Sequence, residues 1–267
     1  MIVCRSAAEL RRLREANQLV GHVLRLVRDA VAPGVTTGEL DALAEREIRA
    51  AGAVPAFKGY KGYPASICAS VNEQVVHGIP SPSRRLREGD IISIDLGTKL
   101  DGFYGDSAVT VAVGKISPRA AELLRVTEES LWKGIEVVRP GTRVSDIGHA
   151  VQAHVEKYGF SVVREFVGHG IGSELHEEPQ IPNYGEPGRG PRLAEGMVLA
   201  IEPMVNAGAA GVRVLGDGWT AVTEDQSLSA HFEHTVAVTS DGVEVLSKPS
   251  AKEDSNEGTS VGQAHLR

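Results

Sequence analysis

The sequence predicts an α+β fold in which helices cover one side of an antiparallel sheet. In each half of the chain, two amphipathic helices are followed by strands. A segment ending at Asp95 recurs 107 residues later in a segment ending at Glu202, and the same offset relates the Pro-Gly pairs at 33–34 and 140–141. Two copies of one unit, rather than the three or more of a solenoid, indicate two halves related by a pseudo-twofold axis.

The first half is predicted to begin with two helices, over residues 6–31 and 36–51. Apolar residues recur at helical spacing in the first helix, and Ser6 with Glu9 forms a capping box at its start. The second helix opens on a similar box and stops at Gly52, because glycine readily adopts the left-handed conformation that ends a helix.

A β-hairpin is predicted next, with strands over 91–97 and 103–113 joined by a turn at 99–102. Asp95 and Asp106 are symmetric about this turn, so we expect their carboxylates to lie directly across from each other. Facing Cβ atoms on adjacent strands are about 4.5–5.5 Å apart, and like charges at that distance repel unless a cation lies between them.

The second half repeats this plan. Its first helix is predicted to open at a Ser-Pro pair with proline in the first turn and to close at a Pro-Gly pair. The elements expected here are helices over 117–140 and 145–158 and strands over 197–205 and 231–238.

One domain is predicted over residues 1–247, because neither half can close a core alone. Its halves are expected at about 6–113 and 114–247. The polar, aperiodic segment 248–267 is expected to be a disordered tail.

Composition excludes several classes of protein. The net charge of −7 and the pI near 5.7 argue against direct nucleic-acid binding, which favours a basic face. Two cysteines cannot form a disulfide framework, and the chain has no signal peptide and no apolar run of membrane-spanning length. We therefore expect a cytoplasmic globular protein without a membrane partner.

Acidic residues in apolar surroundings indicate a metal site. Asp95 lies in an apolar run that contains no Lys or Arg between residues 91 and 98, and Glu202 and Glu233 also lie in apolar strands. A buried carboxylate must be paired or must bind a metal ion. Together with Asp106, these acids predict a site for two divalent cations, whose four positive charges balance four carboxylates.

His169, which lies between glycines, is the best candidate for a fifth ligand. One imidazole with four carboxylates and no thiolate suits manganese, iron, cobalt or zinc better than a structural zinc site. Taken singly, such acids are more often helix caps or solvated charges. His231 lies on the same strand face as Glu233 and either supports the site or is structural, whereas Cys68 is expected to be a small buried apolar residue.

Eight motifs in order connect these residues to a known family. They are Ser70-Val71-Asn72-Glu73, Val76-His77-Gly78-Ile79-Pro80, Ile94-Asp95, Gly102-Phe103-Tyr104-Gly105-Asp106, Gly168-His169-Gly170-Ile171-Gly172, His176-Glu177-Glu178-Pro179, Ile201-Glu202-Pro203-Met204 and Ser229-Ala230-His231-Phe232-Glu233-His234-Thr235. From about residue 6 to 246 the sequence resembles the bacterial type I methionine aminopeptidases, which are pita-bread metallopeptidases. The resemblance implies the pita-bread fold.

The resemblance also implies a role for each metal ligand. Asp95 would be a bidentate ligand of one metal, Asp106 and Glu233 would bridge the two metals, and His169 and Glu202 would complete the second site. A hydroxide between the metals would attack the scissile carbonyl, with Glu202 as the proton shuttle.

The remaining site residues follow from the same resemblance. His176 would contact the scissile carbonyl, and His77 would contact the substrate backbone near the leaving nitrogen. The methionine side chain would occupy a pocket lined by Phe57, Tyr60, Tyr63, Cys68, His77 and Trp219.

The chain departs from the family pattern at three positions around this pocket. Leu175 stands where an aromatic residue is common, Phe57 where a smaller residue often occurs, and Lys61 where a histidine is often found. A monovalent cation bound near Asn72, Gln74 and Ser229 is a further expectation from the resemblance.

The implied function is removal of the initiator methionine from nascent proteins whose second residue is small. The expected partner is the N-terminal segment of a nascent chain at the ribosome exit, and the protein is expected to be a monomer. Two alternatives are a proline-specific exopeptidase, such as aminopeptidase P or prolidase, and a metal-free pita-bread protein that only binds its partner.

Overall fold

The structure, a computed structural model, describes residues 1–248 of the chain. The helices are α1 (Ala7–Asp29), α2 (Thr37–Ala50), α3 (Pro118–Glu136) and α4 (Val144–Glu156), with a short 3-10 turn, η1 (Tyr60–Gly62). The strands of the first half are β1 (Val54–Pro55), β2 (Ile67–Val71), β3 (Gln74–Val76), β4 (Ile91–Leu100) and β5 (Phe103–Ala112). Those of the second half are β6 (Ser161–Val162), β7 (Gly168–Gly170), β8 (Glu177–Ile181), β9 (Val198–Ile201), β10 (Met204–Asn206), β11 (Val212–Val214), β12 (Ala221–Thr223), β13 (Ser229–His231), β14 (Glu233–Val238) and β15 (Val243–Val245).

Three of the four helices begin where their caps predict, whereas α4 begins one residue before the predicted Ser145, with Arg143 as its cap. Ser6 and Glu9 form both bonds of the capping box that starts α1, and α2 opens on an equivalent box. The α3 helix starts at the Ser-Pro pair as expected, but it ends at Glu136, before the predicted stop at Pro140. A proline disfavours the helical conformation in the residue directly before it, so it limits how far a helix can extend. The helix can still end several residues earlier.

Nine of the strands in residues 1–248 form a central antiparallel sheet whose order repeats in the two halves. Its central path runs β2-β4-β5-β14-β9-β7, with β1 and β8 at the margins and β15 beside β14. The two halves therefore meet between β5 and β14. An axis at this boundary exchanges β4 with β9 and β2 with β7, which confirms the α+β fold predicted from the repeat.

Small contacts repeat at the same offset of 107 residues. Isolated bridges join Thr36 to Arg85 in one half and Arg143 to Arg192 in the other. Each of these two bridges also carries an arginine that donates to the carbonyl of a Pro-Gly glycine, at 2.6 Å in the first half and 3.0 Å in the second. The duplication is thus present in local hydrogen bonding as well as in strand order.

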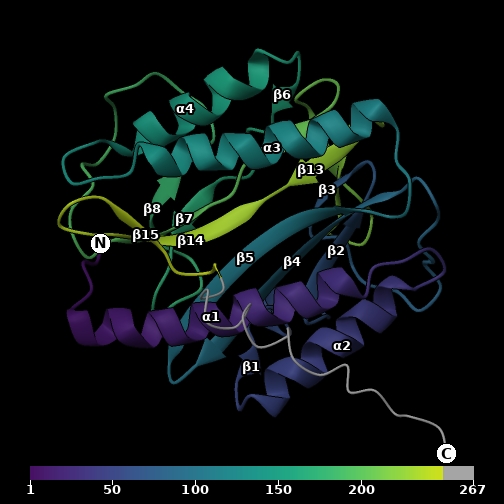
Figure 1. Cartoon of the computed structure of the whole chain (residues 1–267), viewed down its shortest axis with the longest axis horizontal. Helices are drawn as coiled ribbons and strands as arrows, with labels where there is room; N and C mark the ends of the chain where they lie inside the picture. The colour runs from purple at the N-terminus through teal and green to yellow at the C-terminus, as the bar shows by residue number, and fades with distance from the viewer. Residues whose placement is uncertain (249–267) are drawn as a thin grey trace, which may run out of the picture.

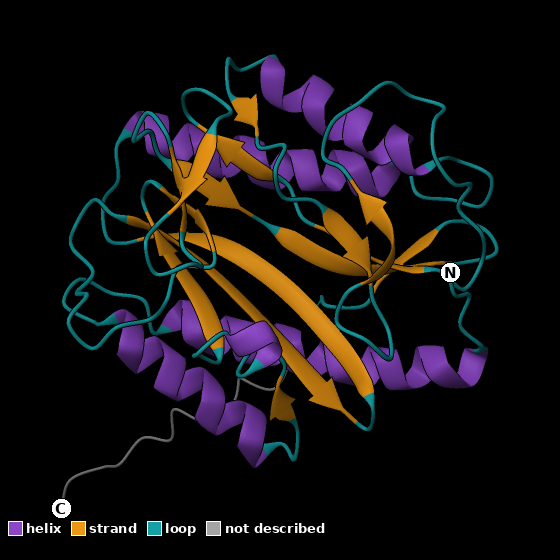
Figure 2. Cartoon of the chain, turned by 180° about the vertical axis from the view of Figure 1, so that it is seen from behind, coloured by secondary structure: helices purple, strands orange, loops and turns teal. Residues whose placement is uncertain are grey.

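The four helices pack on one side of the curved sheet as two pairs. Figure 1 shows α1 and α2 across one half and α3 and α4 across the other, and in Figure 2, seen from behind, the long strands pass in front of the helices. The α1 helix approaches β5 closely at Gly105, where an added Cβ would lie 2.9 Å from the Ala16 carbonyl. The opposite face of the sheet is thereby left to the site.

The predicted hairpin is present, but its register differs from the expected one. The turn is the two-residue pair Asp101-Gly102, and both residues have positive φ. Asp95 consequently lies opposite Ala108, not Asp106. The prediction of direct opposition was wrong by two residues, which leaves both aspartates on the same face of the sheet because side chains alternate with a period of two.

Two predicted strands are each divided. The strand predicted at 197–205 breaks after Ile201, and the one predicted at 231–238 breaks at Phe232. Pro203 has no N–H to donate to a strand ladder, so pairing cannot continue there. At these breaks the chain leaves the central sheet for a second, three-stranded sheet of β13, β10 and β6.

The predicted tail lies outside the described residues except for Lys248. The division of the chain into one domain of two halves stays a prediction. Within residues 1–248, every helix is too short or too polar to cross a membrane.

Candidate metal centre

A cavity of about 190 Å³ lies on the face of the sheet away from the helices, and it gathers all twelve residues predicted for the site. Its lining comprises Phe57, Tyr60, Lys61, Tyr63, Cys68, His77, Asp95, Asp106, His169, Leu175, His176, Glu202, Trp219 and Glu233. The roles assigned to these residues stay predictions, but the structure brings the residues together.

The five predicted ligands come from five strands that are neighbours in the central sheet. Asp95 lies on β4, Asp106 on β5, Glu233 at the start of β14, Glu202 directly after β9, and His169 on β7. Glu202 and Glu233 lie at the two breaks where the chain leaves the central sheet. Five neighbouring strands of the central sheet therefore bring the five side chains together at one cavity.

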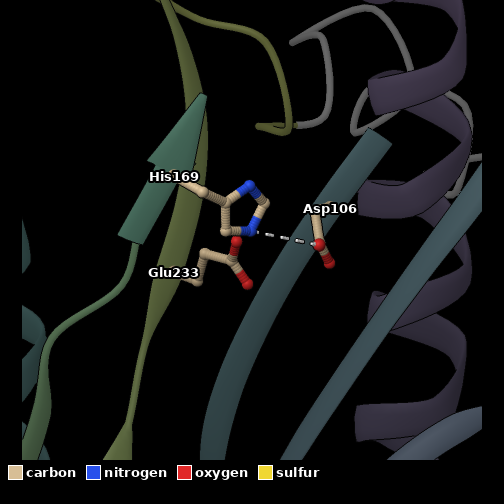
Figure 3. Close-up of side chains that lie close together, drawn as sticks. All are labelled: Asp106, His169 and Glu233. Carbon is tan, nitrogen blue, oxygen red and sulfur yellow. Dashed lines mark ion pairs between the residues drawn. The ribbon is translucent and has the colours of Figure 1, made fainter. Parts of the chain in front are cut away.

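The separations between these side chains suit a shared ion. Asp106, His169 and Glu233 offer ligand atoms that all lie within 4.8 Å of one another (Figure 3). The Nε2 atom of His169 is 3.9 Å from Asp106 Oδ2 and 3.5 Å from Glu202 Oε1, which is too long for a good hydrogen bond. Ligand–ion distances of about 2.0–2.2 Å place two ligands of one ion about 3–4 Å apart.

Unpartnered oxygens show what the cluster lacks. Asp95 Oδ1, Asp106 Oδ1 and Glu233 Oε1 are buried and have no hydrogen-bond partner among the described residues. Burial raises the pKa of Asp95 to about 7 and that of Glu202 to about 8, and burial with the neighbouring acids raises the pKa values of Asp106 and Glu233 well above their usual range. Divalent cations would remove this penalty, so the residues fit a metal site.

His169 is prepared to act as a ligand. Its Nδ1 atom lies 2.9 Å from the carbonyl oxygen of Gly170, which can only accept, so Nδ1 carries the proton and Nε2 presents its lone pair to the acids. Burial lowers the pKa of His169 to about 4, which keeps the ring neutral at pH 7.

Two other histidines face the cavity from its aromatic side. His176 stacks on Tyr60 with ring centroids 5.3 Å apart, and its Nδ1 lies 2.9 Å from the Tyr60 hydroxyl. His77 packs edge-on against Trp219 and Phe166. Burial lowers the pKa of His77 to about 4 and that of His176 to about 3, so both rings are neutral at pH 7.

Three buried polar residues contact the acids or their backbone. Asn17, fully buried on α1, accepts a hydrogen bond of 3.3 Å from the backbone N–H of Asp106, and Asn183 donates to the backbone carbonyl of Glu202 at 2.9 Å. His231 Nε2 is 3.6 Å from Glu202 Oε2. Neither asparagine is among the residues predicted from the sequence, although a buried Asn on the apolar face of a helix is a signal for such a role.

The segments predicted to bind a monovalent cation are also adjacent. The backbone N–H of Ser229 donates to the carbonyl of Asn72 at 2.9 Å, and the Gln74 side chain accepts from the N–H of Val71 at 2.8 Å. Binding of a cation here stays a prediction.

The sequence model of metallopeptidase family M24 matches residues 11–240. The chain belongs to this family. It is 56% identical over 248 residues to methionine aminopeptidase 1 of Bacillus subtilis, covering 93% of this chain and 100% of that protein. Membership in a metallopeptidase family implies the use of divalent metal, as the sequence predicted.

Solved structures give the same result. The methionine aminopeptidase of Thermotoga maritima matches with a TM-score of 0.92 and 49% identity over 93% of this chain and 100% of that one. The prolidase of Pyrococcus horikoshii matches with a TM-score of 0.73 and 21% identity, and the match covers 94% of this chain but only 65% of the prolidase. The prolidase therefore shares the fold alone, and the predicted resemblance to methionine aminopeptidases and the pita-bread fold are confirmed.

Proposed function

We propose that this protein is a metal-dependent aminopeptidase that removes the N-terminal methionine from polypeptides whose second residue is small. The observation that carries the proposal is the single cavity that holds both a cluster of metal-ligating side chains and a pocket of aromatic and sulfur groups. A thioether packs well among such groups. The acids at the other end suit the free α-amine that only an N-terminal residue possesses.

Two divalent cations would be held by the five ligands. Asp95 would bind one of them, Asp106 and Glu233 would bridge both, and His169 with Glu202 would complete the second. When bound, such cations polarise a carbonyl group and lower the pKa of water to about 7. Cobalt, manganese, iron and zinc all suit this mixture of carboxylates and imidazole.

The chain's own residues would orient the substrate and move the proton. A carboxylate oxygen of Glu202 would accept a proton from the attacking water and return it to the leaving amine. Neutral His176 would donate a hydrogen bond to the scissile carbonyl, where negative charge develops in the transition state. His77 would contact the substrate backbone near the leaving nitrogen.

The methionine side chain would occupy the aromatic end of the cavity. Tyr63 and Trp219 meet edge to face there with ring centroids 5.1 Å apart, and Cys68 and Phe57 are both buried beside them. Burial raises the pKa of the Cys68 thiol, so it stays neutral and apolar in character. Leu175 closes this end and is 1% exposed.

The test is hydrolysis of Met-Ala-Ser against Gly-Pro peptides before and after chelation, with metal added back. We expect methionine release that is lost on chelation and restored by metal. Glu202→Ala should reduce kcat about 100- to 10,000-fold, because it removes the proton acceptor. Glu244→Ala is the matched control, since Glu244 pairs with Arg14 at the surface and should leave activity unchanged.

Two results would contradict the proposal. Cleavage of Gly-Pro peptides in preference to Met-Ala-Ser would favour a proline-specific exopeptidase. No cleavage of either peptide in any metal would favour a protein that only binds its partner.

The proposed substrate suggests where the protein acts. Initiator methionine first becomes accessible on nascent chains at the ribosome exit, so we place the reaction there, in the cytoplasm. We further propose that a monomer suffices, because one chain supplies all five ligands and the pocket.

A further inference from the structure

One positively charged side chain lines the cavity proposed to bind the substrate. Lys61 is the one Lys or Arg among the described residues that line it. Its side chain is exposed, and within residues 1–248 it forms no ion pair. Lys58, three residues earlier, is instead engaged by Glu45 at 2.7 Å.

The position of Lys61 is set by the short turn that carries it. It lies in η1, between the left-handed glycines Gly59 and Gly62, and itself has φ 48°. The Nζ atom is 5.3 Å from the centroid of the Tyr60 ring, a cation–π distance. Tyr60 in turn stacks on His176. The Tyr60 ring therefore contacts both Lys61 and His176, the histidine proposed to contact the scissile carbonyl.

The direction of the substrate puts its downstream residues near this charge. Under the proposed function, the α-amine lies by the buried acids and the methionine side chain fills the aromatic pocket. The rest of the chain must leave through the open side of the cavity, where Lys61 is exposed. An extended chain advances about 3.3–3.6 Å per residue, so the residue after the small one spans about 3.5–7 Å beyond the scissile bond.

The charge of Lys61 acts on this side of the cavity. After burial and the neighbouring His169, Lys61 is the further cause that lowers the pKa of His176. Divalent cations would balance the negative charge of the buried acids. Lys61 would then be the charged side chain in the lining whose charge is not balanced.

We propose that Lys61 is a specificity-determining residue that favours nascent chains with an acidic residue directly after the small second residue. This inference rests on the proposed methionine aminopeptidase activity. An exposed ion pair of this kind changes an equilibrium about 1.5- to 5-fold, which sets the size of the expected effect.

The experiment compares kcat/KM for three C-terminally amidated peptides, Met-Ala-Glu-Ser, Met-Ala-Gln-Ser and Met-Ala-Lys-Ser, with the metal-loaded enzyme. The wild type should prefer Glu over Gln, and Gln over Lys, by about 1.5- to 5-fold at each step. Lys61→Gln should bring the three values together, Lys61→Glu should reverse their order, and Lys61→Arg should keep it. High salt should reduce the preference of the wild type, because exposed charges are screened.

Lys58→Gln is the matched control. It removes a positive charge from the same segment, but Glu45 already neutralises that charge, so this variant should keep the wild-type order of the three peptides. The inference is overturned if Lys61→Gln and Lys61→Glu retain the wild-type ratios while Met-Ala-Gln-Ser is still cleaved. It is also overturned if Lys58→Gln alters the ratios as much as Lys61→Gln does. Failure of the wild type to release methionine from the neutral peptide would instead refute the proposed function itself.

Discussion

Removal of divalent metal should make the protein progressively less stable between pH 6.5 and pH 8. Burial raises the pKa of Asp95 to about 7 and that of Glu202 to about 8. A carboxyl group with a raised pKa keeps its proton in the folded protein at pH values where the unfolded chain has lost it. The stability linked to that proton is complete below about pH 4 and is lost as the pH rises through the folded pKa.

The buried histidines act in the opposite sense, but at lower pH. Burial lowers the pKa of His77, His169 and His234 to about 4 and that of His176 to about 3, and it also lowers the pKa of His231. The stability linked to their neutral rings is nearly complete above about pH 6.5 and is lost as the pH falls through the folded pKa. At pH 6.5 each ring is still about half protonated in the unfolded chain, and over the next pH unit it contributes only a few tenths of a kcal/mol; above about pH 7.5 the rings are neutral in both states, so the carboxyl groups determine the slope.

The size of the effect follows from the pKa values. Each carboxyl that stays protonated only in the folded protein lowers the free energy of unfolding by about 1.4 kcal/mol per pH unit. Glu202 keeps its proton to about pH 8, so it alone accounts for a loss of about 2 kcal/mol across this interval. In a chain of this length such a loss lowers the melting temperature by about 4–8 °C.

Thermal unfolding followed by circular dichroism, after chelation and dialysis, measures this slope. Added manganese should reverse it, because the ligands must be deprotonated to bind and binding stabilises the folded state. Glu202→Gln should flatten the metal-free slope by about 1.4 kcal/mol per pH unit. A metal-free melting temperature that is constant or increases from pH 6.5 to 8 would show that the acids are not buried together as described.

Two further predictions concern the contact of α1 with the strand that carries Asp106. Gly105→Ala should destabilise the protein by about 1–3 kcal/mol in urea unfolding, since the new methyl group meets the Ala16 backbone, whereas Gly216→Ala, with no atom within 4 Å, should cost less than about 1 kcal/mol. Asn17→Ala should weaken metal binding in calorimetric titrations, because the Asp106 N–H loses its buried acceptor. Unchanged metal affinity in a folded Asn17→Ala protein would limit Asn17 to a structural role.

The elements that depend on local sequence were predictable. Both capping boxes of the first half bond as their residue types predict, because a Ser or Thr followed by Glu satisfies the free N–H groups of the first turn regardless of the rest of the fold. The pairing of Asp95 was not predictable in the same way. Moving the turn centre from residues 100–101 to 101–102 shifts every facing pair by two residues.

That error left the site prediction intact for a physical reason. A shift of two residues preserves the face on which each side chain lies, so Asp95 and Asp106 still point into one cavity. The breaks at Pro203 and Phe232 depend on pairing with a second sheet, which the hydrophobic pattern of a single strand cannot reveal. The supporting role of Asn17 likewise depends on contact between segments about 90 residues apart.

The pseudo-twofold axis explains how two similar halves can serve different purposes. The equivalent strands β2 and β7 each flank the strand that leads to a repeated acid, yet β2 places Cys68 opposite Asp95, whereas β7 places His169 opposite Ala200. Burial and the charge of Asp95 keep the Cys68 thiol protonated, which makes it a poor ligand and a good wall for an apolar side chain. The neutral imidazole of His169 presents a free Nε2 to the acids. Equivalent strands, at positions that differ by two residues in register, would therefore supply a wall of the proposed substrate pocket on one side of the axis and a proposed metal ligand on the other.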